Sequence, residues 1–290
     1  MDKRIKYSKP SRKPSSGKNT NLILPVIVGL AMIGCLGAVI YMFLIEHPMG
    51  KDDLAIVDRG VAIVTGLKTD DVADKDSFVS NGCILNVAEN EDANNTMKQV
   101  SVLNYLRKTS ATKVTTDFSN DKIKSIIADA HLKNAYSDTV KDFNSYVKNT
   151  LKNSYEIKAT EAADLYAKTY GSGFENATII WRLNGYVYDK DRNVFYADNN
   201  NMDVTTMISG SDGIGCTAGD TYYIKDHYST VGDNYYLYVG EKKLDIAFDD
   251  DTTKEAKYTP SKEDLKNLPK YRFVFKKDDN SIKFVKFEEL

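Results

Sequence analysis

The chain has 290 residues, of which 42% are hydrophobic, and it carries 39 basic and 41 acidic side chains for a formal net charge of −2. From residue 51 onward, 32 basic side chains stand against 39 acidic ones. This balance argues against a nucleic-acid partner, which is expected to meet a basic patch, while about 240 residues suffice for one large domain.

Residues 22–45 form an apolar, uncharged segment that is long enough to cross a bilayer, which needs ~20 helical residues. The segment follows a short tail rich in Lys and Arg, and such a basic flank normally stays in the cytoplasm. The sequence therefore predicts a disordered basic cytoplasmic tail (1–21), a single-pass transmembrane helix (22–45), a linker (46–53) and a domain outside the cell membrane (54–290). The lipid bilayer is then one expected partner.

Two alternatives compete with this uncleaved helix. A cleaved signal peptide has an apolar core of only ~7 to 15 residues, whereas this core is longer and ends at Ile45, just before Glu46. Lipid attachment at Cys35 is the second alternative, because residues 32–35 partly resemble a bacterial lipobox. The apolar run continues from Cys35 to Ile45, which favours the helix.

Outside the apolar segment the cysteines are Cys83 and Cys216. An oxidising exterior favours disulfides, so a bond between these two residues is predicted; it would stabilise the fold by ~4 to 5 kcal/mol in the chain-entropy model. Two separate thiols or a reactive pair are the alternatives. No zinc site is expected, because the Cys and His residues lack close paired spacing, and no other cofactor is expected.

Apolar residues at spacings of three and four predict helices in the first half of the chain. The first is built on Leu54, Val57, Val61 and Val64, and the second on Val102, Tyr105 and Leu106 within residues 96–108. A third is expected within 134–152. A fourth is expected over 161–170, with Thr160 as its N-cap and Gly171 as its end.

After Gly173 the pattern changes to runs of β-branched and aromatic residues, which predict strands. Three hairpins are expected around the turn-rich segments 189–193, 232–233 and 277–280. A mainly helical region (54–172) followed by strands (173–290) predicts an α+β fold, in which helices pack on a curved antiparallel sheet. A cystatin-like or nuclear-transport-factor-like cone is the finer expectation.

Asp189, Asp191 and Asn193 match the opening of a calcium loop, but Val194 and Asn200 stand where that loop needs Gly and Glu. A hairpin turn is therefore expected, with no metal site. The glycine-rich segment 209–220 lacks the helix that a phosphate-binding loop requires. It is expected to be a connecting loop, with a binding loop as the alternative.

His131 and His227 are the histidines of the predicted exterior domain, and neither has a nucleophile motif around it. Asp226 and His227 are adjacent on a predicted strand, so they are expected to point to opposite faces. No catalytic residue is predicted.

Six tyrosines crowd the second predicted hairpin, and they are Tyr222, Tyr223, Tyr228, Tyr235, Tyr236 and Tyr238. Tyrosine is favoured where one end is apolar and the other wet, as at protein and glycan contact surfaces. It is also an ordinary strand residue. These side chains are therefore a candidate recognition face, with simple packing as the alternative.

Three segments carry a resemblance: GSGFENATIIW at 171–181, GIGC at 213–216 and YRFVFKKDDNSIKFVKFEEL at 271–290. Together they resemble uncharacterised exterior proteins of Gram-positive-type bacteria, in which a membrane anchor or lipid-modified Cys precedes a helical region and a terminal β-meander. The resemblance implies fold and placement, and no activity.

The first functional hypothesis is a non-enzymatic, membrane-tethered exterior domain that binds a protein, peptide or cell-wall component through its sheet or its helix–sheet cleft. In topology the chain also looks like the single-pass assembly component of type IV secretion and conjugation machines. The alternative from another class is a surface enzyme with a pocket in the concavity of the sheet.

Overall fold

The computed structural model describes residues 27–28, 30–37, 45–81, 91–114, 118–129, 132–133, 147–148, 150–151, 154–181, 184–198, 220–244, 258–278 and 281–290. The chain divides into two compact units, Met1–Ile45 and Glu46–Leu290, which are described separately.

In the first unit the described helical residues are 27–28 and 30–37. Across the described part of the chain, no helix is long and apolar enough to cross a membrane, since a span needs ~20 residues. This finding corrects the predicted transmembrane helix over 22–45, and with it the single-pass cell-membrane localisation. The predicted tail (1–21) and residues 22–26, 29 and 38–44 of the predicted helix lie outside the described residues.

Cys35 has a free thiol, and no disulfide joins any two described residues. The two residues of the predicted disulfide bond, Cys83 and Cys216, lie outside the described residues.

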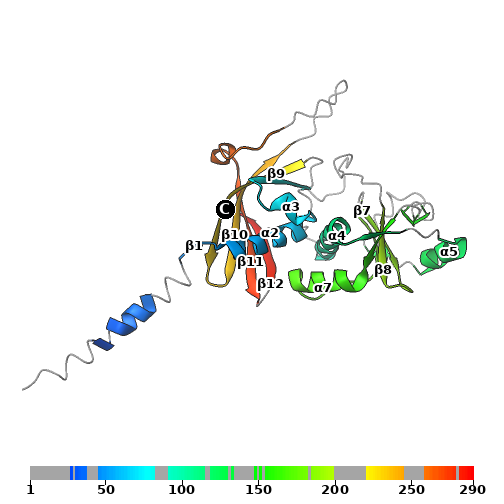
Figure 1. The fold of residues 1–290 in the computed structure, drawn as a ribbon, viewed down its shortest axis with the longest axis horizontal. Helices are drawn as coiled ribbons and strands as arrows, with labels where there is room; N and C mark the ends of the chain where they lie inside the picture. The colour runs from blue at the N-terminus through cyan, green and yellow to red at the C-terminus, as the bar shows by residue number, and fades with distance from the viewer. Residues whose placement is uncertain are drawn as a thin grey trace, which may run out of the picture. The chain divides into compact units, whose positions relative to one another are not determined.

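The second unit alternates helices with strands in chain order (Figure 1). The helices are α2 (Lys51–Thr65), α3 (Thr69–Val72), α4 (Glu91–Thr109), α5 (Asn120–Ala128), α7 (Ala159–Tyr170) and the 3₁₀ turn η2 (Asp264–Lys266). The strands up to α7 are β1 (His47–Pro48), β2 (Ser77–Asn81), β3 (Thr112–Lys113), β4 (Leu132–Lys133) and β5 (Ser154–Lys158). The later strands are β6 (Thr178–Trp181), β7 (Asn184–Asp189), β8 (Val194–Asp198), β9 (Asp220–Val231), β10 (Asn234–Lys243), β11 (Lys270–Asp278) and β12 (Ser281–Glu289).

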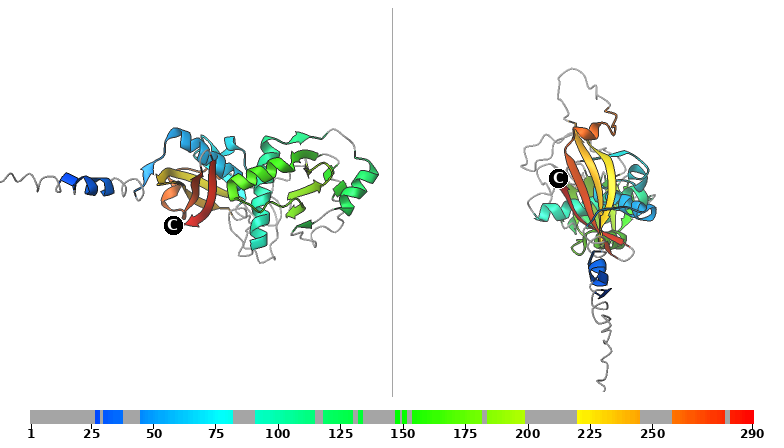
Figure 2. Two further views of the ribbon diagram at one scale, coloured as in Figure 1. Left: turned by 90° about the horizontal axis from the view of Figure 1, so that it is seen from below. Right: turned by 90° about the vertical axis from the view of Figure 1, so that its left-hand side faces the viewer.

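Six of these strands form an antiparallel sheet, called sheet A, in the order β1-β9-β10-β11-β12 with β2 beside β9. Its hairpins β9–β10 and β11–β12 confirm two of the predicted hairpins. Gly232 adopts φ 57° in the β9–β10 turn, a left-handed conformation that tight hairpin turns favour and glycine tolerates. Figure 2 shows the long strands of sheet A side by side with α2 against them.

A second sheet, called sheet B, has the order β3-β5-β8-β7-β6-β4. Its β7–β8 hairpin confirms the third predicted hairpin, and β4 pairs with β6 in parallel. The expected α+β class is confirmed, but the strands belong to two sheets rather than one. Strands β2 and β5 lie in the half of the chain that was expected to be mainly helical. The sequence did not predict them, because runs of five residues are too short to show a clear period.

One face of sheet A is buried in the main hydrophobic core. Leu237, Val239, Phe273 and Phe275 are fully buried there together with Val57 of α2. Burial alternates along β10, as expected for a sheet with one buried and one exposed face. The predicted apolar stripe of α2 is therefore the surface that packs on this sheet.

Helix α7 begins earlier than its sequence pattern indicated. Strand β5 runs directly into it, so Lys158 rather than Thr160 is the N-cap. The predicted end is confirmed, since Gly171 at φ 96° closes the helix. Most of the helix predicted over 134–152 lies outside the described residues.

A buried ion pair joins α2 to β9. Lys225 Nζ donates to Asp58 Oδ1 at 2.9 Å and to the carbonyl of Val72 at 2.6 Å, and Tyr228 Oη donates to the same carboxylate at 2.5 Å. Asp58 and Lys225 are each only 7% exposed. Buried charges require such pairing, so this cluster fixes how α2 lies on sheet A.

Close approach of α2 to sheet A depends on Gly60. A Cβ atom at this position would lie 2.7 Å from Ile282 Cδ1 and 2.9 Å from Phe275 Cε1. Both distances are shorter than van der Waals contact. A larger residue fits at this crossing only if the side chains of Ile282 and Phe275 move.

We expect Lys225→Met to lower the free energy of unfolding by about 3 kcal/mol or more, because Asp58 is left buried without a counter-ion. The double variant Asp58→Leu/Lys225→Met removes both charges and should recover part of that loss. Urea unfolding of the single and double variants measures the coupling. Strictly additive losses would show that the two charges do not stabilise one another.

Gly60→Val should lower the free energy of unfolding by about 2 kcal/mol, since the added methyls overpack the contact with Ile282 and Phe275. Ala55→Val introduces the same side chain on an exposed position of the same helix and serves as the control. Equal stability of the two variants would contradict the close approach described for Gly60.

Candidate functional site

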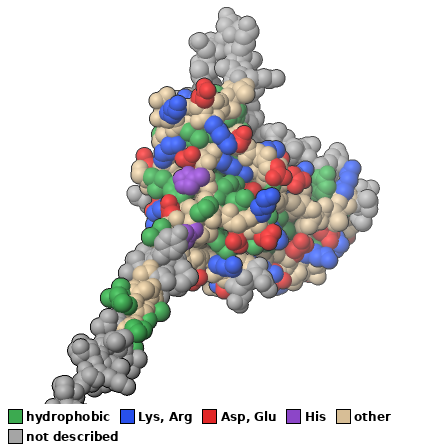
Figure 3. Space-filling view, turned by 60° about the vertical axis from the view of Figure 1, so that its left-hand side comes forward, with side chains coloured by type: hydrophobic (Ala, Val, Ile, Leu, Met, Phe, Trp, Pro, Cys, Tyr) green, Lys and Arg blue, Asp and Glu red, His purple; other side chains and the backbone are tan. Residues whose placement is uncertain are grey.

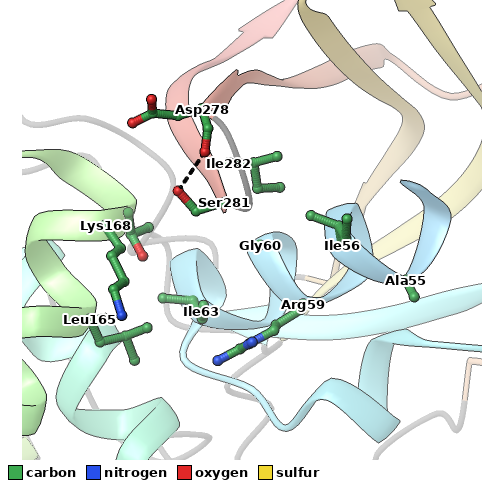
Figure 4. A pocket seen from close by; sticks show the side chains of 11 residues that line it. Ala55, Ile56, Arg59, Gly60, Ile63, Leu165, Lys168, Asp278, Ser281 and Ile282 are labelled. Atoms are coloured by element: carbon green, nitrogen blue, oxygen red, sulfur yellow. Dashed lines mark hydrogen bonds between the residues drawn. The ribbon is translucent and has the colours of Figure 1, made fainter. Parts of the chain in front are cut away.

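A cleft of about 650 Å³ lies where α2, α7 and the β11–β12 hairpin meet (Figure 4). Ligand pockets in proteins commonly enclose ~300 to 1,000 Å³. The cleft is therefore large enough for a small molecule rather than a single ion.

Spacing along the two helices places the lining residues on one face of each. Ile56, Arg59 and Ile63 recur at three and four on α2, and Leu165 and Lys168 are three apart on α7. Residues at these spacings share a helix face. Neither row was singled out from the sequence, because nothing in it indicates that α2 and α7 face a common space.

Aliphatic side chains form the apolar part of the cleft. Ile56, Ile63, Leu165 and Ile282 line it, and they come from all three of its elements. Ile63 is 6% exposed and Ile56 is 36% exposed. The apolar lining thus extends from the protein core to the open side of the cleft.

Two cationic side chains also line the cleft beside these aliphatic residues. The side chains of Lys168 and Arg59 extend from the two helices on either side of Ile63 (Figure 4). Neither makes an ion pair or hydrogen bond with any described residue. Both are therefore available to an external anion.

The remaining polar side chains of the cleft differ in whether they already have a hydrogen-bond or ion-pair partner within the chain. Thr169 is only 4% exposed, lines the cleft, and its hydroxyl makes no hydrogen bond within the described part of the chain. Asp278 already pairs with Lys283 at 2.6 Å. The Ser281 hydroxyl donates to the Asp278 carbonyl at 3.1 Å. The free charges of the described lining are thus both positive, and its partnerless hydroxyl can donate as well as accept.

The six tyrosines of the predicted recognition face are divided between the two faces of sheet A. Tyr223 and Tyr235 belong to the main core, and Tyr228 packs against it. Tyr222, Tyr236 and Tyr238 are partly exposed and alternate with buried neighbours. Half of the predicted face therefore packs inside, and a recognition role for the outer three stays a prediction.

The outer tyrosines already have partners within the chain. Tyr238 stacks on His227 with ring centroids 4.3 Å apart, and the Arg272 guanidinium lies 4.9 Å from the Tyr236 ring. Arg272 Nε also donates to Glu288 at 2.7 Å. Figure 3, which turns the sheet A side of the molecule toward the viewer, shows acidic, basic and apolar side chains intermingled. The described side chains of this face form no patch of a single charge sign.

Asp226 and His227 were expected to point to opposite faces of β9, but the structure brings them together. His227 Nδ1 lies 3.5 Å from Asp226 Oδ2. The β9–β10 register shifts between Leu237 and Val239, opposite this pair, and such a bulge redirects side chains. Both residues are exposed, and Lys270 Nζ also lies 3.6 Å from Asp226 Oδ2.

The segment with the calcium-loop pattern forms the β7–β8 turn, as expected. Lys122 Nζ of α5 donates to Asp189 Oδ1 at 2.8 Å and to Asp191 Oδ2 at 3.0 Å. An ammonium group of the chain thus occupies the place between these carboxylates. Among the described residues no group of three or more His, Cys, Asp or Glu could hold a metal ion.

Several other sequence candidates lie outside the described residues. They are His131, Cys83, Cys216 and the glycine-rich segment up to residue 219.

Glu46 provides a pH-dependent contact on the outer face. Its hydrogen bond from Tyr238 is the largest cause that lowers its pKa below the ordinary value of 4.5, and a bond from Ser229 and the nearby charges of His227 and Arg272 act in the same direction. Because the folded-state pKa is the lower one, this stabilisation is present above pH 4.5 and is lost as the pH falls through the folded-state pKa.

Tyr238→Phe removes that hydrogen bond and should raise the pKa of Glu46 toward 4.5. Carboxyl-carbon NMR titration measures the change, with Tyr222→Phe as the control because Tyr222 pairs with Tyr258 instead. An unchanged Glu46 pKa in Tyr238→Phe would contradict this contact.

No protein-family model matches this chain, and no match was found among curated proteins or solved structures, so its function must be inferred from its own geometry.

Proposed function

We propose that this chain is a non-catalytic binding protein that holds its ligand in the cleft between α2, α7 and the β11–β12 hairpin. The observation that carries the proposal is the pair of unpaired cations, Arg59 and Lys168, above an aliphatic lining. Convergent polar groups on an apolar pocket are the usual composition of a ligand site.

This proposal narrows the hypothesis of a protein, peptide or cell-wall ligand bound through the sheet or the helix–sheet cleft. It favours the cleft, because the outer tyrosines of sheet A are engaged with His227 and Arg272. It also favours ligands with a negative charge, since Asp278 is the acidic residue of the cleft and Lys283 neutralises it.

The enzyme hypothesis required a pocket inside the concavity of the sheet. Fully buried side chains, including Leu237, Phe273 and Phe275, fill the inner face of sheet A. The described residues therefore leave no space there for a substrate. The hypothesis of a secretion or conjugation component relied on a membrane-spanning helix, which the described residues do not contain.

The finer fold expectation, a cystatin-like or nuclear-transport-factor-like cone, stays a prediction for α2 and sheet A alone. There one helix packs across an antiparallel sheet. A cone of this kind has one sheet, so the expectation does not account for sheet B. A likeness in fold would not by itself define a ligand.

Methyl NMR of the full chain tests the binding proposal. With Ile and Leu methyls labelled, a small library of anionic, cationic and neutral amphiphiles should shift the methyls of Ile56, Ile63, Leu165 and Ile282, and each ligand should be recovered unchanged. Ala55→Trp, which places a large side chain in the cleft lining, should suppress the shifts. Lys51→Trp puts the same residue on an exposed position of α2 outside the cleft and serves as the control.

Two results would contradict the proposal. One is a library in which no member shifts the cleft methyls. The other is chemical conversion of a bound ligand, which would show that the cleft catalyses a reaction.

A further inference from the structure

We infer that the cleft binds an aliphatic chain that ends in a carboxylate, as in a medium-chain fatty acid. This inference rests on the proposed binding function and adds the chemical class of the ligand. Three properties of the cleft carry it: the sign of its free charges, the small number of acceptors in its described lining, and the aliphatic nature of that lining.

The free polar groups select an acceptor-rich, negatively charged head. Arg59 presents a planar fork of donors that matches the two oxygens of a carboxylate. Lys168 adds a second positive charge, and the nearly buried Thr169 hydroxyl adds a donor without a partner in the described chain. A cationic head would meet two like charges, and a neutral head would leave both cations unpaired.

The lining selects an aliphatic body. Among the described residues that line the cleft there is no aromatic ring and no side-chain amide. Nucleobases and sugars are held by stacking and by groups that both donate and accept hydrogen bonds. Ile56, Ile63, Leu165 and Ile282 offer neither, whereas they can remove methylene groups from water.

A peptide that ends in a carboxylate fits this site less well than an acyl chain. Each buried peptide N–H requires an acceptor, and an unsatisfied one costs about 1 to 3 kcal/mol. The Asp278 carboxylate pairs with Lys283 and the Ser281 hydroxyl donates to the Asp278 carbonyl. Mainly the hydroxyl oxygens of Thr169 and Ser281 are then left in the described lining to accept from several peptide N–H groups. An acyl chain has no such donors to satisfy.

The exposure of the two cations sets the expected salt response. Arg59 and Lys168 are both exposed, so added salt screens their attraction for the head group. The aliphatic contact is not screened in this way. Binding should therefore weaken with salt but not disappear.

Isothermal titration of the full chain with octanoate, hexanoate, 1-octanol, octylammonium and octyl phosphate tests the inference. Octanoate should bind more tightly than hexanoate by about fourfold per methylene group, and 1-octanol and octylammonium should bind at least tenfold more weakly than octanoate. Acetyl-Leu-Leu with a free carboxylate should also bind more weakly than octanoate.

Two charge-removing variants localise the site. Arg59→Gln should weaken octanoate binding by about tenfold or more, because a charge-assisted hydrogen bond is lost. Lys168→Gln should weaken it by a smaller factor, since an ammonium acts as a point charge. Lys266→Gln removes one charge from an exposed position of η2, outside the cleft, and should leave octanoate affinity unchanged.

Several results would overturn the inference while leaving the binding function in place. They are equal affinity for octanoate and 1-octanol, tighter binding of octyl phosphate or of the peptide, and octanoate binding that Arg59→Gln does not weaken. Failure of octanoate to bind, alongside methyl shifts at the cleft from another library member, would likewise reject only the ligand class. If no library member shifts those methyls, the binding function itself fails.

Discussion

The packing of α2 on the inner face of sheet A is the constraint on which the rest of this structure depends. Two features fix it, and both are sensitive to small changes. The Asp58–Lys225 pair with Tyr228 joins positions 167 residues apart in sequence, and Gly60 lets the helix approach Ile282 and Phe275. Buried paired charges resist sliding and rotation, because any displacement leaves a charge without its partner.

The same packing determines where the cleft lies. Gly60 faces both the aromatic core and the cleft lining, while Ile56, Arg59 and Ile63 on the same helix face line the cleft. Helix α7 supplies the opposite wall, and its Tyr170 contacts Phe284 of β12 at a ring distance of 5.9 Å. The cleft is thus bounded by elements that are well anchored to sheet A, which is the arrangement that keeps a binding site preorganised.

Local sequence patterns predicted the helices and hairpins of this fold better than they predicted which elements pack or pair with one another. The apolar rows of α2 and α7 and the turns at Gly232 and Asp189 are encoded within a few residues of chain, so these helices and hairpins could be predicted. Assignment of strands to two sheets depends on pairing between distant segments, such as Phe78 of β2 with Tyr223 of β9. Neither period nor composition carries that information. The transmembrane prediction relied on the composition of residues 22–45, whereas no helix in the described part of the chain is long and apolar enough to cross a membrane.

The candidate site was even less accessible to sequence reasoning. A lone Arg59 or Lys168 on a helix is usually a solvated side chain, and only the approach of α2 to α7 brings the two into the lining of one cleft. The tyrosines were predicted to form a recognition face because six of them occur in one hairpin. Side chains alternate between the two faces of β9 and β10, however, so half of these tyrosines pack in or against the core. Asp226 and His227 meet because of a bulge, a feature that a simple period of two does not foresee.

The most direct test of the account is a crystal structure of the full chain with 8-bromooctanoate, located by anomalous scattering from bromine. The account predicts one bromine peak within the aliphatic lining near Ile63 and Leu165, with the carboxylate at Arg59 and Lys168. A bromine peak elsewhere on the molecule, or a reversed ligand with its carboxylate away from both cations, would contradict it.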